Sequence, residues 1–273
     1  MPRAVFLPDS CVVADVLPSP NCSERKHDRQ PDMILLHYTG MQDANAALER
    51  LRSPSSKVSA HYLAFEDGHI VQLVQESDRA WHAGVASWAG ETDINSCSIG
   101  IEIVNPGHEF GYPDFPSRQI AAITALCRSI LTRHSVPPER VLAHSDVAPS
   151  RKQDPGEKFP WRRLHDSGVG HWVKPAPTEQ GALLTLGDHC ESVAALQKSL
   201  AEYGYGIAAS GTFDSATLEV VAAFQRHFRP QRVDGVADAS TRKTLDNLLA
   251  NRGRPRNIAA RARAFERLAA VAP

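Results

Sequence analysis

The sequence predicts an α/β domain followed by a small all-α module of three helices. Short apolar, strand-like segments are interspersed with helical patterns up to about residue 170, which is typical of a layered α/β domain. A segment with the composition of a linker follows, and the periodicity after it is helical. We therefore divide the chain into an α/β domain, a linker, a helical module and an Arg-rich tail, at residues 1–170, 171–186, 187–250 and 251–273.

The first half of the α/β domain contains recognisable strands, a helix and a turn. A segment up to about Gln30 is rich in Pro and polar residues, and we expect it to wrap the surface. DMILLH (32–37) has the apolar run of a buried strand. Residues 43–52 predict a short helix with its first residue, an aspartate, as N-cap. The segments 61–65 and 69–74 flank a Glu-Asp-Gly turn and predict a hairpin.

The second half of this domain again mixes strands and a helix. In SIGIEIV (98–104) every second residue is an isoleucine, and this alternation predicts a strand. Apolar spacing over 117–134 predicts a helix with its first serine as N-cap, ended by a Pro-Pro pair. VLAH (141–144) predicts a short strand that ends at its histidine, followed by a loop to about residue 160.

The helical module contains a weak internal repeat. GTFDSAT (211–217) and GVADAST (235–241) each precede a helix. In each copy Gly makes the turn and Asp caps the next helix. An earlier helix over 193–203 completes three helices. The Arg-rich tail is interpreted either as a solvated or disordered tail or as a basic helix that touches an anionic surface.

Composition and charge narrow the class of protein. Hydrophobic residues make up 42% of the chain and the formal net charge is -1, so no global attraction to nucleic acid or anionic membranes is expected. No segment approaches the ~20 apolar residues of a membrane span, and the N-terminus is a poor signal peptide. The five cysteines are expected to be free, buried thiols, with a Cys11–Cys22 disulfide as the alternative.

Three residues could form a metal site. His37 ends the strand DMILLH, His144 ends the strand VLAH, and Asp154 lies ten residues further on. Two strand-end histidines and a loop carboxylate can converge at a sheet edge, and two His with one carboxylate leave a fourth tetrahedral position for water, as in catalytic zinc sites. The alternative is two packed, hydrogen-bonded histidines and an aspartate that stabilises a turn.

Two charged residues could serve catalysis beside such a site. Glu102 occupies the face of SIGIEIV opposite the three isoleucines, within a strand that otherwise has a core composition. It could be a general base, with Gly100 clearing space beside it, or a structural, ion-paired glutamate. Lys152 could stabilise an oxyanion or be a solvated surface lysine.

Five further segments stand out, in this order: LLHYTG (35–40), SAHYLAFEDG (59–68), RAWHAG (79–84), NSCSIGIEI (95–103) and LAHSDVAPSRKQDPG (142–156). Together they resemble amidase family 2, most closely its AmiD-type members, over about residues 30–165. The resemblance implies a mixed central sheet flanked by helices and one Zn²⁺ per chain. It also implies hydrolysis of the amide bond between N-acetylmuramic acid and the L-alanine of the stem peptide in peptidoglycan.

The resemblance assigns roles to individual positions. The implied zinc ligands are His37, His144 and Asp154, and the implied catalytic residues are Glu102 and Lys152. The implied substrate-binding residues are Tyr38, Trp81, His82, Ala83 and Asn95. His61 matches a further motif position, either structural or functional. Relatives often carry a basic residue just before the Asn at position 95, where this sequence has Asp93-Ile94.

The helical module resembles the peptidoglycan-binding domain type 1 over about residues 187–248. The expected partners are therefore peptidoglycan or muropeptides, bound by a monomer in the cell envelope or periplasm, with the cytoplasm as the alternative. Three other functions stay open: a non-catalytic peptidoglycan-binding or sensing protein, a different zinc hydrolase of wall peptides such as an endopeptidase, and a cytosolic enzyme that recycles anhydro-muropeptides.

Overall fold

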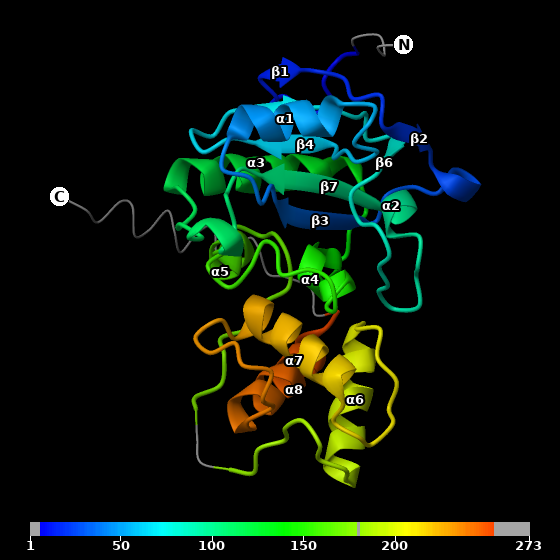
Figure 1. Cartoon of the computed structure of the whole chain (residues 1–273). Coiled ribbons are helices and arrows are strands. Elements are labelled where there is room, and N and C mark those ends of the chain that lie inside the picture. Colours follow the sequence, from blue (N-terminus) through cyan, green and yellow to red (C-terminus); the bar gives the residue numbers. More distant parts are fainter. Residues whose placement is uncertain (1–5, 179–180, 254–273) are drawn as a thin grey trace, which may run out of the picture.

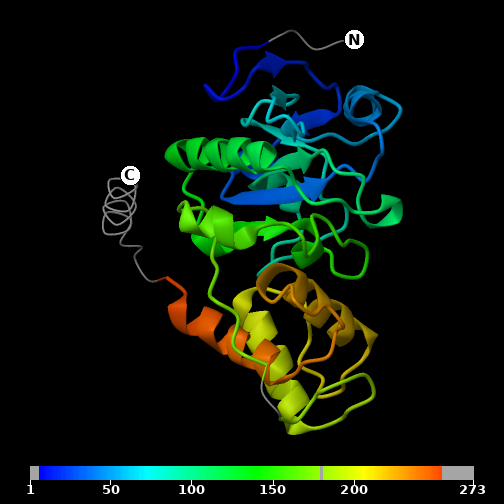
Figure 2. The same ribbon diagram turned by 90° about the vertical axis from the view of Figure 1, so that its left-hand side faces the viewer.

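The computed structural model describes residues 6–178 and 181–253. Figure 1 shows an α/β body above a module of three helices, and Figure 2 shows the same two layers from the side. Most of the predicted Arg-rich tail, residues 254–273, lies outside the described residues. Within the described part of the chain, no helix is long and apolar enough to cross a membrane.

The body is built on a mixed sheet, as predicted, and this sheet has six strands. Its strand order is β1-β5-β4-β7-β3-β8; β4 and β5 are antiparallel, and every other neighbouring pair is parallel. The strands are β1 (Asp15–Val16), β3 (Met33–Tyr38), β4 (Tyr62–Ala64), β5 (Ile70–Gln72), β7 (Ser98–Ile103) and β8 (Val141–Ala143). A second, antiparallel sheet pairs β2 (Cys22–Glu24) with β6 (Asp78–Ala80).

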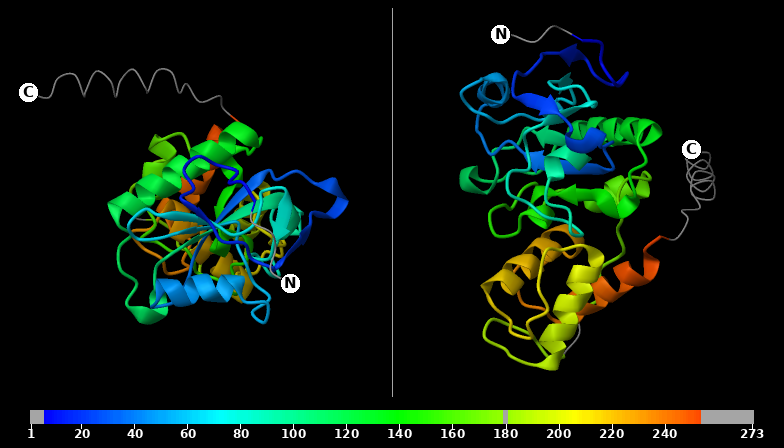
Figure 3. Two further views of the ribbon diagram at one scale, coloured as in Figure 1. Left: turned by 90° about the horizontal axis from the view of Figure 1, so that it is seen from above. Right: turned by 90° about the vertical axis from the view of Figure 1, so that its right-hand side faces the viewer.

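Helices cover both faces of the sheet. Seen from above in Figure 3, α1 (Ala44–Arg52) and α3 (Ser117–Arg133) lie on opposite sides of it. The isoleucines of β7 pack with the buried face of α3, while Leu51 of α1 packs with Leu63 and Val71 on the other side. The remaining helices of the body are α2 (Ile94–Cys97), α4 (His144–Val147) and α5 (Trp161–Asp166), with 3-10 turns at Lys26–Asp28, His108–Phe110 and Pro138–Arg140.

Several predicted boundaries are wrong by one or two residues; β3, for example, does not end at His37 but runs one residue further, to Tyr38. Ser117 is the first residue of α3 and makes no capping hydrogen bond, because Pro116 occupies the N-cap position. His144 does not end a strand: β8 stops at Ala143, and His144 opens α4. In that turn the Asp146 carboxylate accepts a hydrogen bond from the Ala143 amide at 2.8 Å, which helps to close the turn.

The three helices of the module are α6 (Glu191–Tyr203), α7 (Ser215–Phe228) and α8 (Ala239–Asn251). The internal repeat has the predicted physical basis, because Asp214 and Asp238 accept hydrogen bonds from the amides three residues later, at 2.8 and 2.7 Å. Gly211 and Gly235 both have a positive φ. The repeat extends to two buried glutamines, since Gln197 and Gln225 each bond the backbone of the following glycine turn.

The body and the module share one hydrophobic cluster. Met33 and Leu35 of β3 and Trp88 of a loop belong to the same cluster as Tyr203 and Phe224 of the module. The body has apolar clusters of its own on its sheet, and this further cluster buries apolar side chains of both parts together. Apolar burial of this kind holds the module against the body.

All five cysteines are free thiols, so the disulfide alternative is not supported. The expectation of burial is wrong for Cys11 and Cys190, which are exposed, and correct for Cys97 and Cys127.

Candidate active site

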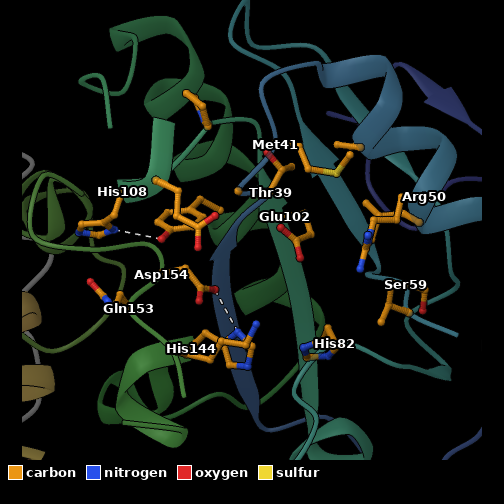
Figure 4. A pocket seen from close by; sticks show the side chains of 18 of the residues that line it. Thr39, Met41, Arg50, Ser59, His82, Glu102, His108, His144, Gln153 and Asp154 are labelled. Carbon is orange, nitrogen blue, oxygen red and sulfur yellow. Dashed lines mark hydrogen bonds and ion pairs between the residues drawn. The ribbon is translucent and has the colours of Figure 1, made fainter. Parts of the chain in front are cut away.

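The ends of two neighbouring strands bring three donor groups together. His37 lies in β3, and His144 directly follows β8, which pairs with β3 in parallel. The Nδ1 atoms of the two histidines are 2.9 Å apart, and Oδ2 of Asp154 lies 3.0 Å from that of His144 and 3.3 Å from that of His37. All three residues are buried. Figure 4 shows His144 and Asp154 at one end of the cavity.

This arrangement fits a zinc ion. Bonds of 2.0–2.1 Å to a tetrahedral centre place its ligand atoms about 3.3–3.4 Å apart, and two His plus one carboxylate are typical of catalytic zinc sites. The observed separations of 2.9–3.3 Å are close to that value. Among the described residues, His37, His144 and Asp154 form a group whose donor atoms lie close enough together to hold a metal ion.

Electrostatics keeps His37 and Asp154 in the form that binds a metal. Burial, and then the positive charge that His144 would carry, lower the pKa of His37 to about 4, so its imidazole is neutral at neutral pH. Burial opposes ionisation of Asp154, but the two histidines outweigh it and hold the pKa of that carboxyl below its usual value. Neutral imidazoles and a carboxylate are the protonation states required for metal binding.

The outward-facing nitrogens of both histidines have partners. His144 Nε2 lies 3.0 Å from the Ala83 carbonyl, and His37 Nε2 lies 3.1 Å from His82 Nδ1. His82 Nε2 in turn lies 3.3 Å from Ser98 Oγ, which donates to the carbonyl of residue 94. One set of tautomers satisfies each of these outward contacts: each histidine donates from Nε2 and leaves Nδ1 unprotonated, so that the Nδ1 lone pairs of His37 and His144 face the proposed metal position. Such partners orient metal-binding histidines.

His144 and Asp154 line a cavity of about 590 Å³, whereas His37 is not among its lining residues. Its lining carries charges of both signs, with Glu102, Glu109 and Asp154 opposed by Arg50, Arg151 and Lys152. Figure 4 shows Glu102 facing the same space as His144 and Asp154, with Arg50 on the far side.

Glu102 is directly opposite His37 in the register of β7 and β3, and it is half-buried. Its Oε2 atom is shut off from solvent and has no hydrogen-bond partner among the described residues. Burial, and then the charge of Asp154, raise the pKa of Glu102 well above its usual value, although Lys152 acts in the opposite direction. A buried carboxylate oxygen without a partner is unusual in folded proteins and marks Glu102 as a candidate general base.

Comparisons with known proteins agree with this geometry. The family model described as N-acetylmuramoyl-L-alanine amidase matches residues 27–157, and the model described as putative peptidoglycan binding domain matches residues 190–245. The chain is 36% identical to N-acetylmuramoyl-L-alanine amidase AmiD of Escherichia coli K12 over 237 residues, covering 81% of this chain and 83% of AmiD. The chain belongs to the N-acetylmuramoyl-L-alanine amidase family.

Solved structures of relatives match this fold over most of the chain. The E. coli AmiD complex with anhydro-N-acetylmuramic acid-L-Ala-D-gamma-Glu-L-Lys superposes with a TM-score of 0.72 at 35% identity, covering 85% of this chain and 94% of that one. AmpDh3 of Pseudomonas aeruginosa superposes with a TM-score of 0.68 at 31% identity, covering 84% and 95%. This protein is therefore an N-acetylmuramoyl-L-alanine amidase, a hydrolase of a zinc-dependent family.

The five expected substrate-binding residues of the amidase divide into two groups. Tyr38, Trp81 and His82 line the cavity. Ala83 and Asn95 are not among its lining residues. Instead, Asn95 Oδ1 accepts hydrogen bonds from the amides of His82 and Ala83, at 3.0 and 2.9 Å, and so fixes the carbonyl that contacts His144.

Gly100 and His61 have structural roles behind the cavity. The space beside Gly100 is filled by the His82 ring, which a Cβ at position 100 would approach to 2.5 Å. It is therefore not open space for Glu102, as was expected from the sequence. His61 is fully buried, and its Nδ1 accepts a hydrogen bond from the Gly100 amide at 2.9 Å. His61 is not among the cavity-lining residues, so its contacts are those of a structural residue.

Sequence reasoning missed several residues around the site. Arg151 donates to the carbonyls of Ala83 and Val85. The Tyr38 hydroxyl lies 3.0 Å from His108 Nδ1, and His108 Nε2 lies 3.1 Å from Glu157. No local pattern marks these residues, because each contact joins residues more than 40 positions apart.

Asp93 lies two residues before Asn95, where the sequence has an acidic residue and no basic one. Its carboxylate pairs with Arg79 at 2.8 Å and lies 3.5 Å from the Lys26 ammonium. This corner therefore carries an acidic group that two cationic side chains neutralise.

Proposed function

We propose that this amidase hydrolyses the bond between the lactyl carbonyl of N-acetylmuramic acid and the L-alanine amine, with one zinc ion held by His37, His144 and Asp154. The observation that carries the proposal is the convergence of three metal-binding atoms beside a partnerless carboxylate oxygen on Glu102. When bound, zinc acts as a Lewis acid that activates water and polarises a carbonyl.

The residues of the chain supply the proton transfers. Glu102 accepts the proton of the attacking water and then delivers it to the departing L-alanine amine. Its raised pKa suits this role, because the carboxyl group must both accept and release a proton near neutral pH. Lys152 makes no ion pair with another described residue, and its positive charge stabilises the oxyanion that develops on the carbonyl.

The proposed substrates are peptidoglycan and its muropeptide fragments. E. coli AmiD was solved with an anhydro-muramyl peptide, and AmpDh3 with an anhydromuramic pentapeptide. A cavity of about 590 Å³ lies within the usual range for small-molecule sites. We assign Tyr38, Trp81 and His82 to substrate contact, and Ala83 and Asn95 to support of His144.

The helical module supports action on the cell wall itself. A soluble fragment needs no anchor, whereas a wall-binding module keeps an enzyme on an insoluble polymer and raises its local concentration there. We therefore propose a monomer that works in the cell envelope on intact peptidoglycan. Recycling of soluble fragments in the cytoplasm is the alternative function.

The test uses purified full-length protein with and without a zinc chelator. Mass spectrometry of digested sacculi should show stem peptides with a free L-alanine amine, and chelation should abolish them. Cleavage within the stem peptide would overturn the assigned bond in favour of an endopeptidase. Unchanged sacculi together with cleaved anhydro-muropeptides would select fragment recycling, and binding without cleavage of either would overturn the catalytic proposal.

A further inference from the structure

The helical module forms hydrogen bonds with one buried carboxylate of helix α4, the helix that begins with the proposed zinc ligand His144. Asp146, two residues after His144, is fully buried. Its Oδ1 accepts a hydrogen bond from the Tyr205 hydroxyl at 2.7 Å, and its Oδ2 contacts His227 Nδ1 at 2.7 Å. Both partners belong to the module, and α7, which carries His227, packs directly on α4 (Figure 1).

Both partner side chains are fixed by aromatic packing. The Tyr205 ring lies edge-to-face against Trp88, with 4.9 Å between the ring centroids. The His227 ring stacks on Trp161 at 3.7 Å and on Phe228 at 3.8 Å. Neither donor can swing away from the carboxylate without disturbing this packing, so the module presents two preset donors to α4.

The same carboxylate fixes the backbone that carries two of the three proposed zinc ligands. Besides its module partners, Asp146 accepts the Ala143 amide at 2.8 Å, immediately before His144. Just after His144, the amide of Ser145 donates to the Asp154 carbonyl at 3.0 Å. A displacement of α4 would therefore move His144 and Asp154 together.

An interface that only holds the module against the body does not need the Asp146 carboxylate. Apolar side chains can join two surfaces, whereas a buried charge carries a desolvation penalty and is a weak source of stability. Its benefit is directional, because charge-assisted hydrogen bonds fix orientation. Among the described helices of the body, α4 is the one that the module contacts through hydrogen bonds to a buried carboxylate, and α4 begins with a proposed zinc ligand.

We propose that Tyr205 and His227 are positioning residues for the zinc site, acting through Asp146. The helical module is thus part of the active-site scaffold in addition to its role on the wall. This inference rests on the proposed zinc-dependent function, and it predicts that changes inside the module alter zinc affinity even where no wall is present.

The experiment compares Tyr205→Phe with Tyr203→Phe in the full-length protein. Both changes remove one buried phenolic hydroxyl and keep the ring, but the Tyr203 hydroxyl contacts His171 Nδ1 at 2.9 Å rather than the metal-site helix. Zinc affinity is measured by competition with a chromophoric chelator, and the melting temperature is measured without zinc. Mutation of a residue that supports metal ligands typically weakens metal binding by about 10–100-fold. Because Asp146 acts through the backbone, we expect the lower end, about tenfold weaker zinc binding for Tyr205→Phe.

The outcomes separate positioning from stability. Tyr203→Phe should bind zinc as wild type does, even where its melting temperature falls as far as that of Tyr205→Phe. Unchanged zinc affinity in Tyr205→Phe, or equal losses in both variants, would overturn the inference. A wild-type protein that binds no zinc would instead overturn the proposed function.

A second pair of variants keeps the test decisive if Tyr205→Phe does not fold. His227→Leu removes the other donor to Asp146, whereas His227→Gln retains an N–H group of similar reach. Weaker zinc binding in the Leu variant with recovery in the Gln variant is expected. Equal zinc affinity in the two variants would contradict the positioning role.

Discussion

Replacing Gly100 with alanine is a small change with a large expected effect. An added Cβ would meet the His82 ring at 2.5 Å from Cγ and 2.6 Å from Nδ1. Ordinary contacts begin at 3.4 Å, so the ring must retreat by about 1 Å. His82 Nδ1 and His37 Nε2 are 3.1 Å apart in the wild type, and we expect a movement of this size to break their hydrogen bond.

Two consequences follow, and they are measured separately. Overpacking of a filled site costs about 1–3 kcal/mol, which lowers the melting temperature by about 2–4 °C per kcal/mol in a chain of this size. Loss of the partner that orients His37 should weaken zinc binding by about 10–100-fold. Thermal unfolding of the zinc-free protein gives the first quantity, and competition with a chelator gives the second.

Gly181→Ala is the matched control. It adds the same methyl group at a glycine without a positive φ, where the nearest atom is the Cβ of Ala239 at 3.3 Å. This control should bind zinc as wild type does. If Gly100→Ala binds zinc as tightly as wild type, then the His82 ring does not orient His37 and the reasoning is refuted.

Three further predictions test the site and the fold. Glu102→Gln should keep zinc and lose about 10²–10⁴-fold in kcat, because an amide cannot accept the proton; metal analysis beside the kinetics checks this, and loss of zinc would make Glu102 a ligand or support. His144→Ala should lose both zinc and activity in equilibrium dialysis and turnover assays, and retained zinc would remove His144 from the ligand set. Burial alone would raise the pKa of Glu76, but hydrogen bonds from His134 and Arg133 lower it to about 2 from 4.5. Since the folded pKa is the lower one, this stabilisation is complete above pH 4.5 and is lost as the pH falls toward 2. Glu76→Gln should therefore be less stable than wild type by about 3 kcal/mol at pH 7, a gap that closes near pH 2 in urea unfolding; a gap independent of pH would contradict the cause assigned here.

The elements with local causes were predictable from the sequence. The alternation in SIGIEIV puts the isoleucines of β7 against α3 and Glu102 on the cavity side. Asp43, Asp214 and Asp238 cap the helices that follow them. These features depend on side-chain periodicity and on hydrogen bonds between residues a few positions apart, so a short stretch of sequence contains all the information.

Helix and strand ends were less predictable. Serine is a residue type that N-caps favour, yet Pro116 occupies the N-cap position of α3 and Ser117 is already its first helical residue. His144 continues an apolar run, yet its backbone already belongs to α4. In both cases neighbouring backbone contacts select between two adjacent positions that the sequence leaves equivalent.

By itself, the sequence determined that two histidines lie at or near the ends of strands, that a carboxylate interrupts a core strand, and that a glycine–aspartate repeat builds the module. Only the tertiary structure decided which of these groups meet. It placed the His82 ring over Gly100, turned Asn95 toward the backbone amide of His82, and joined Asp146 to two side chains of the module. The physical reason is that these contacts join residues from 13 to 81 positions apart, and their distances are set by how whole strands and helices pack, which no local pattern encodes.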